Sequence, residues 1–156
     1  MKIEIDQSGK IEKTSKPTVV GFSNSEQGVV IILSREKKIV QKFFRQSKKP
    51  RLFMALTFAA AVCILLKSVI RKCHQVVLDK EYSGFEKFIN RKLSEFIFEN
   101  YKVSDIRIST MQIGKKSRAH ILSYKTYKLK DKRAIRKIYA KEIIKIIERN
   151  LKSGST

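Results

Sequence analysis

The sequence predicts an α/β protein in which helices flank a mixed β-sheet of five strands. Short segments of alternating or β-branched apolar residues predict the strands, and they occur near the N-terminus and again after residue 74. A long uncharged segment and several amphipathic patterns predict the helices. With 156 residues, 42% of them hydrophobic, the chain can bury a core. We expect one domain over residues 1–152 and a disordered tail at 153–156.

The first three predicted strands form an antiparallel meander. The first strand alternates isoleucine with charged residues and is expected to stop at Asp6, just before a Ser-Gly turn signal. The next two strands occupy residues 18–23 (TVVGFS) and 29–33 (VVIIL). A polar connection that ends in Gly28 joins them and suits a hairpin.

The uncharged segment at residues 52–66 predicts a helix that is buried on nearly all sides. We expect this helix to run from Arg51 to Lys72, after a shorter helix near residues 39–44. Its fifteen uncharged residues fall short of the number that spans a membrane, about twenty. Basic residues flank both ends, so the charge asymmetry of a membrane span is missing. A core helix is therefore favoured over a membrane anchor, which is kept as the weaker alternative.

The second half of the chain alternates strands and helices. Residues 75–78 predict a fourth strand that ends in Asp79, and residues 103–111 predict a fifth. Ser83 and Glu86 have the spacing of a capping box, and Ser117 is a plausible cap for a later helix. A last amphipathic helix is expected over residues 135–147. The predicted order is βββαβαβα.

This order brings two aspartates together. A helical crossover from the third to the fourth strand would place the fourth strand parallel to the first. Asp6 and Asp79 would then lie at neighbouring strand ends, and an extended backbone would put Glu81 on the same side as Asp79. Clustered carboxylates repel one another unless a cation neutralises them, and an oxygen-rich site suits Mg²⁺ or Mn²⁺. Alternatively, Asp6 only forms a turn, and Asp79 and Glu81 are loop residues that cap the next helix.

The chain is strongly basic, which points to a polyanionic partner. It has 35 Lys and Arg residues against 14 Asp and Glu, a formal charge of +21. A nucleic acid or an anionic membrane surface is the natural partner of such a charge, and we expect nucleic acid, either DNA or RNA. Alternatively, the excess of Lys and Arg reflects a general bias of the proteome. Tyrosines that could stack on unpaired bases are interleaved with the late basic residues. The residues expected to bind phosphates are Lys115, Lys116, Arg118, Lys125, Lys128, Lys130 and Arg133.

Two further features bear on compartment and assembly. Charged residues interrupt the N-terminus, which therefore lacks a signal-peptide pattern, and Cys63 and Cys73 form no disulfide framework. We expect a cytoplasmic protein without a membrane partner, and the sequence leaves a homodimer open.

The elements and the placed acids together resemble the ribonuclease H-like superfamily, which includes ribonuclease H, RuvC-type junction resolvases and Piwi domains. The resemblance covers residues 2–130 and rests on the βββαβα order, DQSG after the first strand, LDKEY after the fourth, and SRAHILSYK at a late helix. It implies that Asp6 and Asp79 are metal-binding catalytic residues, with Glu81 as a rival for the second role. His120 would take the late-helix position, where it could bind the metal or shuttle a proton; otherwise it is an exposed histidine at a helix start.

One departure from the superfamily affects the expected activity. Ribonuclease H carries a glutamate on its first long helix, whereas residues 51–72 contain no acid. The residues therefore favour a resolvase-like or Piwi-like ligand set, or an inactive relative. The leading hypothesis is a Mg²⁺- or Mn²⁺-dependent nuclease that cleaves phosphodiester bonds of structured DNA or RNA-containing duplexes. The alternative is a basic nucleic-acid-binding protein without catalysis.

Overall fold

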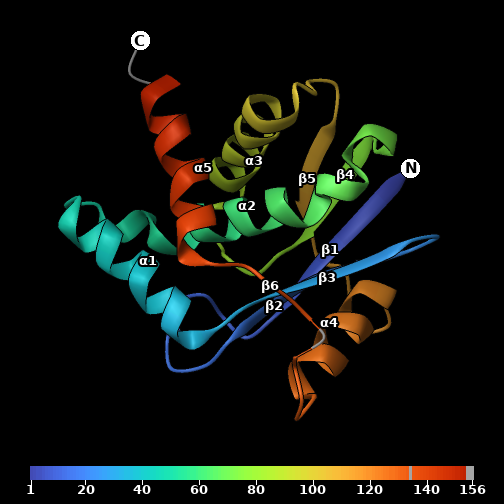
Figure 1. Ribbon diagram of the computed structural model, residues 1–156. Coiled ribbons are helices and arrows are strands. Elements are labelled where there is room, and N and C mark those ends of the chain that lie inside the picture. Colours follow the sequence, from blue (N-terminus) through green and yellow to red (C-terminus); the bar gives the residue numbers. More distant parts are fainter. Residues whose placement is uncertain (134, 154–156) are drawn as a thin grey trace.

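A computed structural model describes residues 1–133 and 135–153, which form an α/β fold with a mixed sheet and five α-helices (Figure 1). The described part of the chain contains six strands in the order β5-β4-β1-β2-β3-β6. The strands are β1 (Lys2–Ser8), β2 (Thr18–Ser23), β3 (Gln27–Ile32), β4 (Gln75–Asp79), β5 (Arg107–Met111) and β6 (Arg136–Lys137). The predicted α/β class is confirmed, whereas the predicted number of five strands was wrong.

The strand directions follow the predicted connections. β1, β2 and β3 are antiparallel neighbours, as expected for a meander. β4 lies beside β1 and runs parallel to it, with Ile5 opposite Leu78. The long helical connection between β3 and β4 makes this parallel pairing possible.

The sixth strand explains an error in the prediction of the last helix. Arg136 and Lys137 pair in parallel with Val30 and Ile31 of β3, and the amide of Ile138 donates to the carbonyl of Ile31 at 2.9 Å. These hydrogen bonds hold the backbone extended, so the helix predicted over residues 135–147 begins only at residue 140. The chain then continues as α5 (Ala140–Ser153). Of the predicted tail, Ser153 belongs to this helix, and residues 154–156 lie outside the described part of the chain.

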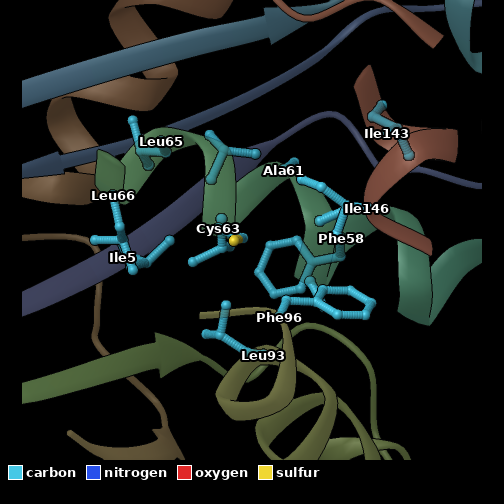
Figure 2. Close-up of a cluster of buried hydrophobic side chains, with 14 of the residues drawn as sticks. Ile5, Phe58, Ala61, Cys63, Leu65, Leu66, Leu93, Phe96, Ile143 and Ile146 are labelled. Carbon is cyan, nitrogen blue, oxygen red and sulfur yellow. The ribbon is translucent and has the colours of Figure 1, made fainter. Parts of the chain in front are cut away.

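The helices occupy both faces of the sheet. α2 (Phe53–Leu65) lies among α1 (Ser34–Gln46), α3 (Glu86–Tyr101) and α5, whereas α4 (Arg118–Lys128) lies on the opposite face against β1 and β2 (Figure 1). Alternation along β1 divides its side chains between the two faces. Ile5 joins the core with Phe58, Cys63 and Phe96 (Figure 2). Asp6 therefore points toward α4.

The segment around α2 is the core of the protein, as predicted, but its regular helix is shorter than expected. Short 3₁₀ turns at Pro50–Leu52, Leu66–Ser68 and Ile70–Lys72 flank α2 and replace the predicted single helix from residue 51 to 72. Among the described residues, Pro50–Ser68 is the one helical segment that is long and apolar enough to cross a membrane, and 67% of its most apolar window is buried by the rest of the protein. The core helix of a soluble protein can have the same length and composition, so these two properties do not distinguish it from a membrane span.

Three other predicted boundaries shift. β1 continues to Ser8, so Asp6 lies inside the strand, opposite Gly21, and the strand ends before Gly9, which has a positive φ of 81°. β5 begins only at residue 107. α3 begins without a capping bond from Ser83; instead the carboxylate of Glu86 accepts a hydrogen bond from the amide of Gly84.

Candidate metal centre

Three carboxyl groups meet where β1 and β4 lie side by side. Asp6 stands on β1, Asp79 is the last residue of β4, and Glu81 follows two positions later. The parallel register that places Ile5 opposite Leu78 also places Asp6 next to Asp79. One carboxyl oxygen of each acid lies within 4.8 Å of the others. The predicted convergence of these acids is therefore observed, although Asp6 reaches it from within the strand.

Asp6 is buried and is held by two residues of α4. Its side chain is 1% exposed, and its Oδ2 lies 2.8 Å from Nδ1 of His120. Ser123 donates a second hydrogen bond from Oγ to the same oxygen at 3.2 Å. The other oxygen, Oδ1, is buried and has no hydrogen-bond partner among the described residues when both acids are ionised. A proton shared with Asp79 would join the two carboxyl groups. One oxygen of Asp6 is thus fixed by α4, and the other is left to the acidic cluster.

His120 reaches Asp6 because α4 begins at a defined position. The Oγ of Ser117 accepts a hydrogen bond from the amide of Ala119, so the predicted cap is confirmed. His120 then falls in the first turn, with its side chain 32% exposed. Since Nδ1 faces Asp6, Nε2 is the nitrogen that can bind an ion or exchange a proton.

A hollow of about 400 Å³ adjoins the acids. The amide of Ile113 donates to Oδ1 of Asp79 at 2.9 Å, which fixes this carboxylate at the rim. Residues from the segments after β4 and β5 and from α4 line the hollow, including Asp79, Glu81, Ser83, Gln112, Lys115 and His120. Asp79, Glu81 and His120 therefore face a common space that a ligand can enter.

The electrostatics favour protons on the cluster when no cation is bound. Burial, and then the neighbouring Asp79, raise the pKa of Asp6, while the bond from His120 acts in the opposite direction. Burial and the carboxylates of Asp79 and Asp6 raise the pKa of Glu81 to about 7. Carboxylates in such proximity disfavour joint ionisation. A divalent cation would remove this penalty.

The donor set suits a hard divalent cation. The three clustered acids offer oxygen ligands only, and the buried Oδ1 of Asp6 has no competing donor in the described part of the chain apart from a proton shared with Asp79. Oxygen ligands with room for water or phosphate oxygens are typical of Mg²⁺ and Mn²⁺ sites. Asp6, Asp79 and Glu81 could hold such an ion, and His120 is placed to join them or to act beside them.

The basic residues predicted to bind phosphates surround the start and the far end of α4. Lys115 lines the hollow, and Lys116 and Arg118 follow at the start of the helix. Lys125 and Lys128 are exposed in its last turns, and Lys130 and Arg133 lie beyond it. Arg133 pairs with Asp131 at 2.8 Å, which lowers its value as a free phosphate ligand.

The two interleaved tyrosines of α4 differ in their surroundings. The ring of Tyr124 is exposed, stacks on His120 at 6.1 Å between ring centroids, and lies 5.5 Å from Nζ of Lys128. Tyr127 instead packs against Gly9. Tyr124 is therefore the exposed ring of the pair, and a base that stacks on it would have to do so beside His120 and Lys128.

Several residues of the site have little signal in the sequence. Ser123, which bonds Asp6, and Tyr82, whose hydroxyl bonds Gln7 and the amide of Ile11, are ordinary residues of their segments. Lys37 of α1, which lies outside the acidic cluster, does have a signal in the sequence. It interrupts an apolar helical stripe formed by Leu33, Val40 and Phe44, and a lysine at such a position is a sequence signal for a buried polar role.

Comparisons of the chain with protein-family models, curated proteins and solved structures found no match.

Proposed function

We propose that the protein is a metal-dependent nuclease that uses Mg²⁺ or Mn²⁺ to cleave phosphodiester bonds of structured DNA or RNA-containing duplexes. The observation that carries this proposal is the cluster of Asp6, Asp79 and Glu81, in which a buried aspartate also bonds a histidine. Convergence of these acids has a cost in the metal-free protein, because burial and mutual repulsion oppose their ionisation, and a bound cation would remove that cost. The surrounding excess of Lys and Arg makes a polyanion the fitting substrate.

The sheet order supports a ribonuclease H-like arrangement. β3, β2 and β1 form an antiparallel meander, and β4 and β5 continue the sheet in parallel with β1. The resemblance in sequence implies catalytic roles for the acids of β1 and β4, and their convergence supports that proposal. β6 is an addition at the β3 edge and leaves this central arrangement unchanged.

Each residue of the site would have its own role in hydrolysis. A bound divalent cation would polarise the phosphate and lower the pKa of a water molecule. Asp6, Asp79 and Glu81 would hold and orient the cation, with Asp6 fixed by Ser123. His120, whose Nδ1 is oriented by Asp6, is placed to bind the cation or to move a proton at Nε2. The lysines around the start of α4 would hold the phosphate backbone.

The lack of an acid on α2 affects the predicted substrate. α2 contains no Asp or Glu, and Glu36 of α1 accepts a hydrogen bond from the amide of Ala140, where it stabilises the start of α5. The ligand set therefore draws on β1, the end of β4 and α4. This set favours a resolvase-like or Piwi-like nuclease over a strict ribonuclease H.

A non-catalytic nucleic-acid-binding protein is the second candidate. The raised pKa values of Asp6 and Glu81 favour it, because both acids could stay protonated and the cluster would then persist without a cation. The basic surface would serve binding alone.

A cleavage panel tests the proposal. It contains a four-way junction, an RNA–DNA hybrid duplex, plain duplex and single strands, each with Mn²⁺, with Mg²⁺ and with EDTA. We expect metal-dependent cleavage of at least one structured substrate and none with EDTA. Binding without cleavage of any substrate, together with no effect of Mn²⁺ on the melting temperature, would support the non-catalytic candidate.

A further inference from the structure

The loop between β1 and β2, residues 9–17, is fastened to a buried lysine of α1. Nζ of Lys37 donates hydrogen bonds to the carbonyl oxygens of Lys10, Lys13 and Lys16 at 2.9, 2.7 and 2.7 Å. The side chain of Lys37 is 0% exposed. An ammonium group has three donors, and here each of them serves one carbonyl of the same loop.

This arrangement sets the direction of the loop side chains. The three residues whose carbonyls turn inward to Lys37 are lysines, and all three are themselves exposed. Three cations at every third position therefore stand on the outer side of one loop. A single buried ammonium fixes the spacing of this group, which we call the loop lysines.

Additional bonds hold the loop from both sides. Ser34, at the start of α1, donates from Oγ to the carbonyl of Thr14. On the side of the acidic cluster, the amide of Ile11 donates to the hydroxyl of Tyr82 at 3.2 Å. Gly9 approaches Pro17 so closely that a β-carbon would lie 2.3 Å from its carbonyl oxygen. The loop is thus closed at its base and tied to α1 and to the segment after β4.

One of the loop lysines, Lys10, belongs to the end of the loop that lies beside the candidate metal centre. Tyr82, which holds Ile11, directly follows Glu81. Burial and the neighbouring carboxylates raise the pKa of Glu81, and the charge of Lys10 acts against this increase. Lys10 is therefore close enough to the acids to influence them. A polyanion that extends from the hollow past Lys10 would meet the loop lysines as well as the cations of α4.

A buried ammonium at this place needs a role, because an apolar residue would complete the stripe of α1 more easily. Burial lowers the pKa of Lys37 to about 8, which is the sign of a charge removed from water. Its hydrogen bonds offset part of this desolvation cost. The three hydrogen bonds of Lys37 hold the conformation of a loop that has no regular secondary structure of its own.

We propose that Lys37, assisted by Ser34, is a positioning residue that holds the loop lysines as a binding surface for the phosphodiester backbone of a nucleic acid. The inference rests on the proposed function for the identity of the partner and extends it to a second contact surface. Each of Lys10, Lys13 and Lys16 would bind phosphate without reading the base sequence.

The first test neutralises the loop lysines. The variant Lys10→Gln/Lys13→Gln/Lys16→Gln is compared with Lys2→Gln/Lys67→Gln/Lys102→Gln, which removes the same charge from exposed lysines at the opposite ends of the strands. Binding of a labelled four-way junction is measured in EDTA by fluorescence anisotropy over a range of salt concentrations. Loss of three phosphate contacts should reduce the slope of log K against log salt by roughly 2 to 3. Equal slopes for the two triple variants would overturn the proposal.

The second test releases the loop without changing its charges. In Lys37→Met we expect faster hydrogen exchange at the amides of residues 10–17 and a reduced salt slope, although the loop lysines are intact. Combination of Lys37→Met with the loop triple should give little further loss, because both act on the same contacts. Should Lys37→Met fail to fold, Ser34→Ala loosens the same loop at Thr14. A loosened loop with wild-type affinity and slope would refute the positioning role.

The two proposals fail in different ways. Binding is measured in EDTA, so an inactive protein can still show a salt slope that depends on the loop lysines. That result would refute the nuclease proposal and leave the proposed binding surface intact. If the wild type and the loop triple both cleave the substrate and bind it with equal affinity, the nuclease proposal stands and the proposed binding surface is refuted.

Discussion

Nδ1 of His120 lies 2.8 Å from Oδ2 of Asp6, although 114 positions separate the two residues in the chain. The pair joins the first turn of α4 to the central strand β1 and points toward the acids that follow β4. It links the basic face of the protein to its acidic cluster, and it makes both residues testable.

Asp6→Asn should leave the fold intact, with an equal or higher melting temperature in EDTA. The amide can still accept the hydrogen bonds from His120 and Ser123, and it replaces a repelling carboxylate with a donor toward Asp79. Cleavage should fall by orders of magnitude, because the cation loses an anionic ligand, whereas nucleic-acid binding should persist. Thermal melts with and without Mn²⁺ and single-turnover assays measure these effects. The exposed, remote Asp105→Asn is the control. Equal cleavage by Asp6→Asn and wild type would eliminate the metal-site hypothesis.

His120→Ala should lower the cleavage rate by roughly 10²- to 10⁴-fold if the imidazole moves a proton, with a smaller effect on substrate affinity. Added imidazole should then restore part of the rate. His120→Asn, which can still donate to Asp6, separates the orientation of Asp6 from proton transfer. Full activity of both variants would assign His120 a structural role only.

The stability of the metal-free protein should fall as the pH rises. Glu81 has a pKa of about 7 in the folded protein against an ordinary value of 4.5, so between these values the folded state retains a proton that the unfolded chain has released. The folded state therefore loses stability through this pH range, and the raised pKa of Asp6 adds to the same trend. Melting temperatures in EDTA from about pH 5 to about pH 8 check this expectation.

Glu81→Gln provides the control for this pH dependence, because it cannot ionise and should show a flatter curve. Saturating Mn²⁺ should reverse the trend in the wild type, since a cation binds the deprotonated carboxylates. A wild-type curve in EDTA that matches that of Glu81→Gln would contradict the coupled acidic cluster.

Ala60→Lys should prevent folding. Ala60 is 0% exposed in the middle of α2, and an unpaired buried charge costs several kcal/mol. Ser68→Lys places the same charge on an exposed residue at the end of the same segment and should be tolerated. Soluble expression and circular dichroism compare the two. A folded Ala60→Lys protein would show that this face of α2 is not in the core.

The sequence alone determined the elements with strong local patterns. Alternating isoleucines in β1, the hairpin of β2 and β3, the apolar α2 and the Ser117 cap of α4 all carry their signal within a few residues. Because a helical crossover constrains β4 to run parallel to β1, even the approach of Asp6 to Asp79 could be predicted.

The remaining features depend on partners that are distant in the chain, so local sequence patterns could not predict them. β6 exists because the edge of β3 offers hydrogen bonds to Arg136 and Lys137, and this pairing overrides the helical pattern of those residues. The bond between His120 and Asp6, and the contacts of Lys37 with three carbonyls of a loop, likewise need packed elements to hold both partners. Local periodicity records which face of an element is apolar. It does not record which polar groups of another element will lie against that face.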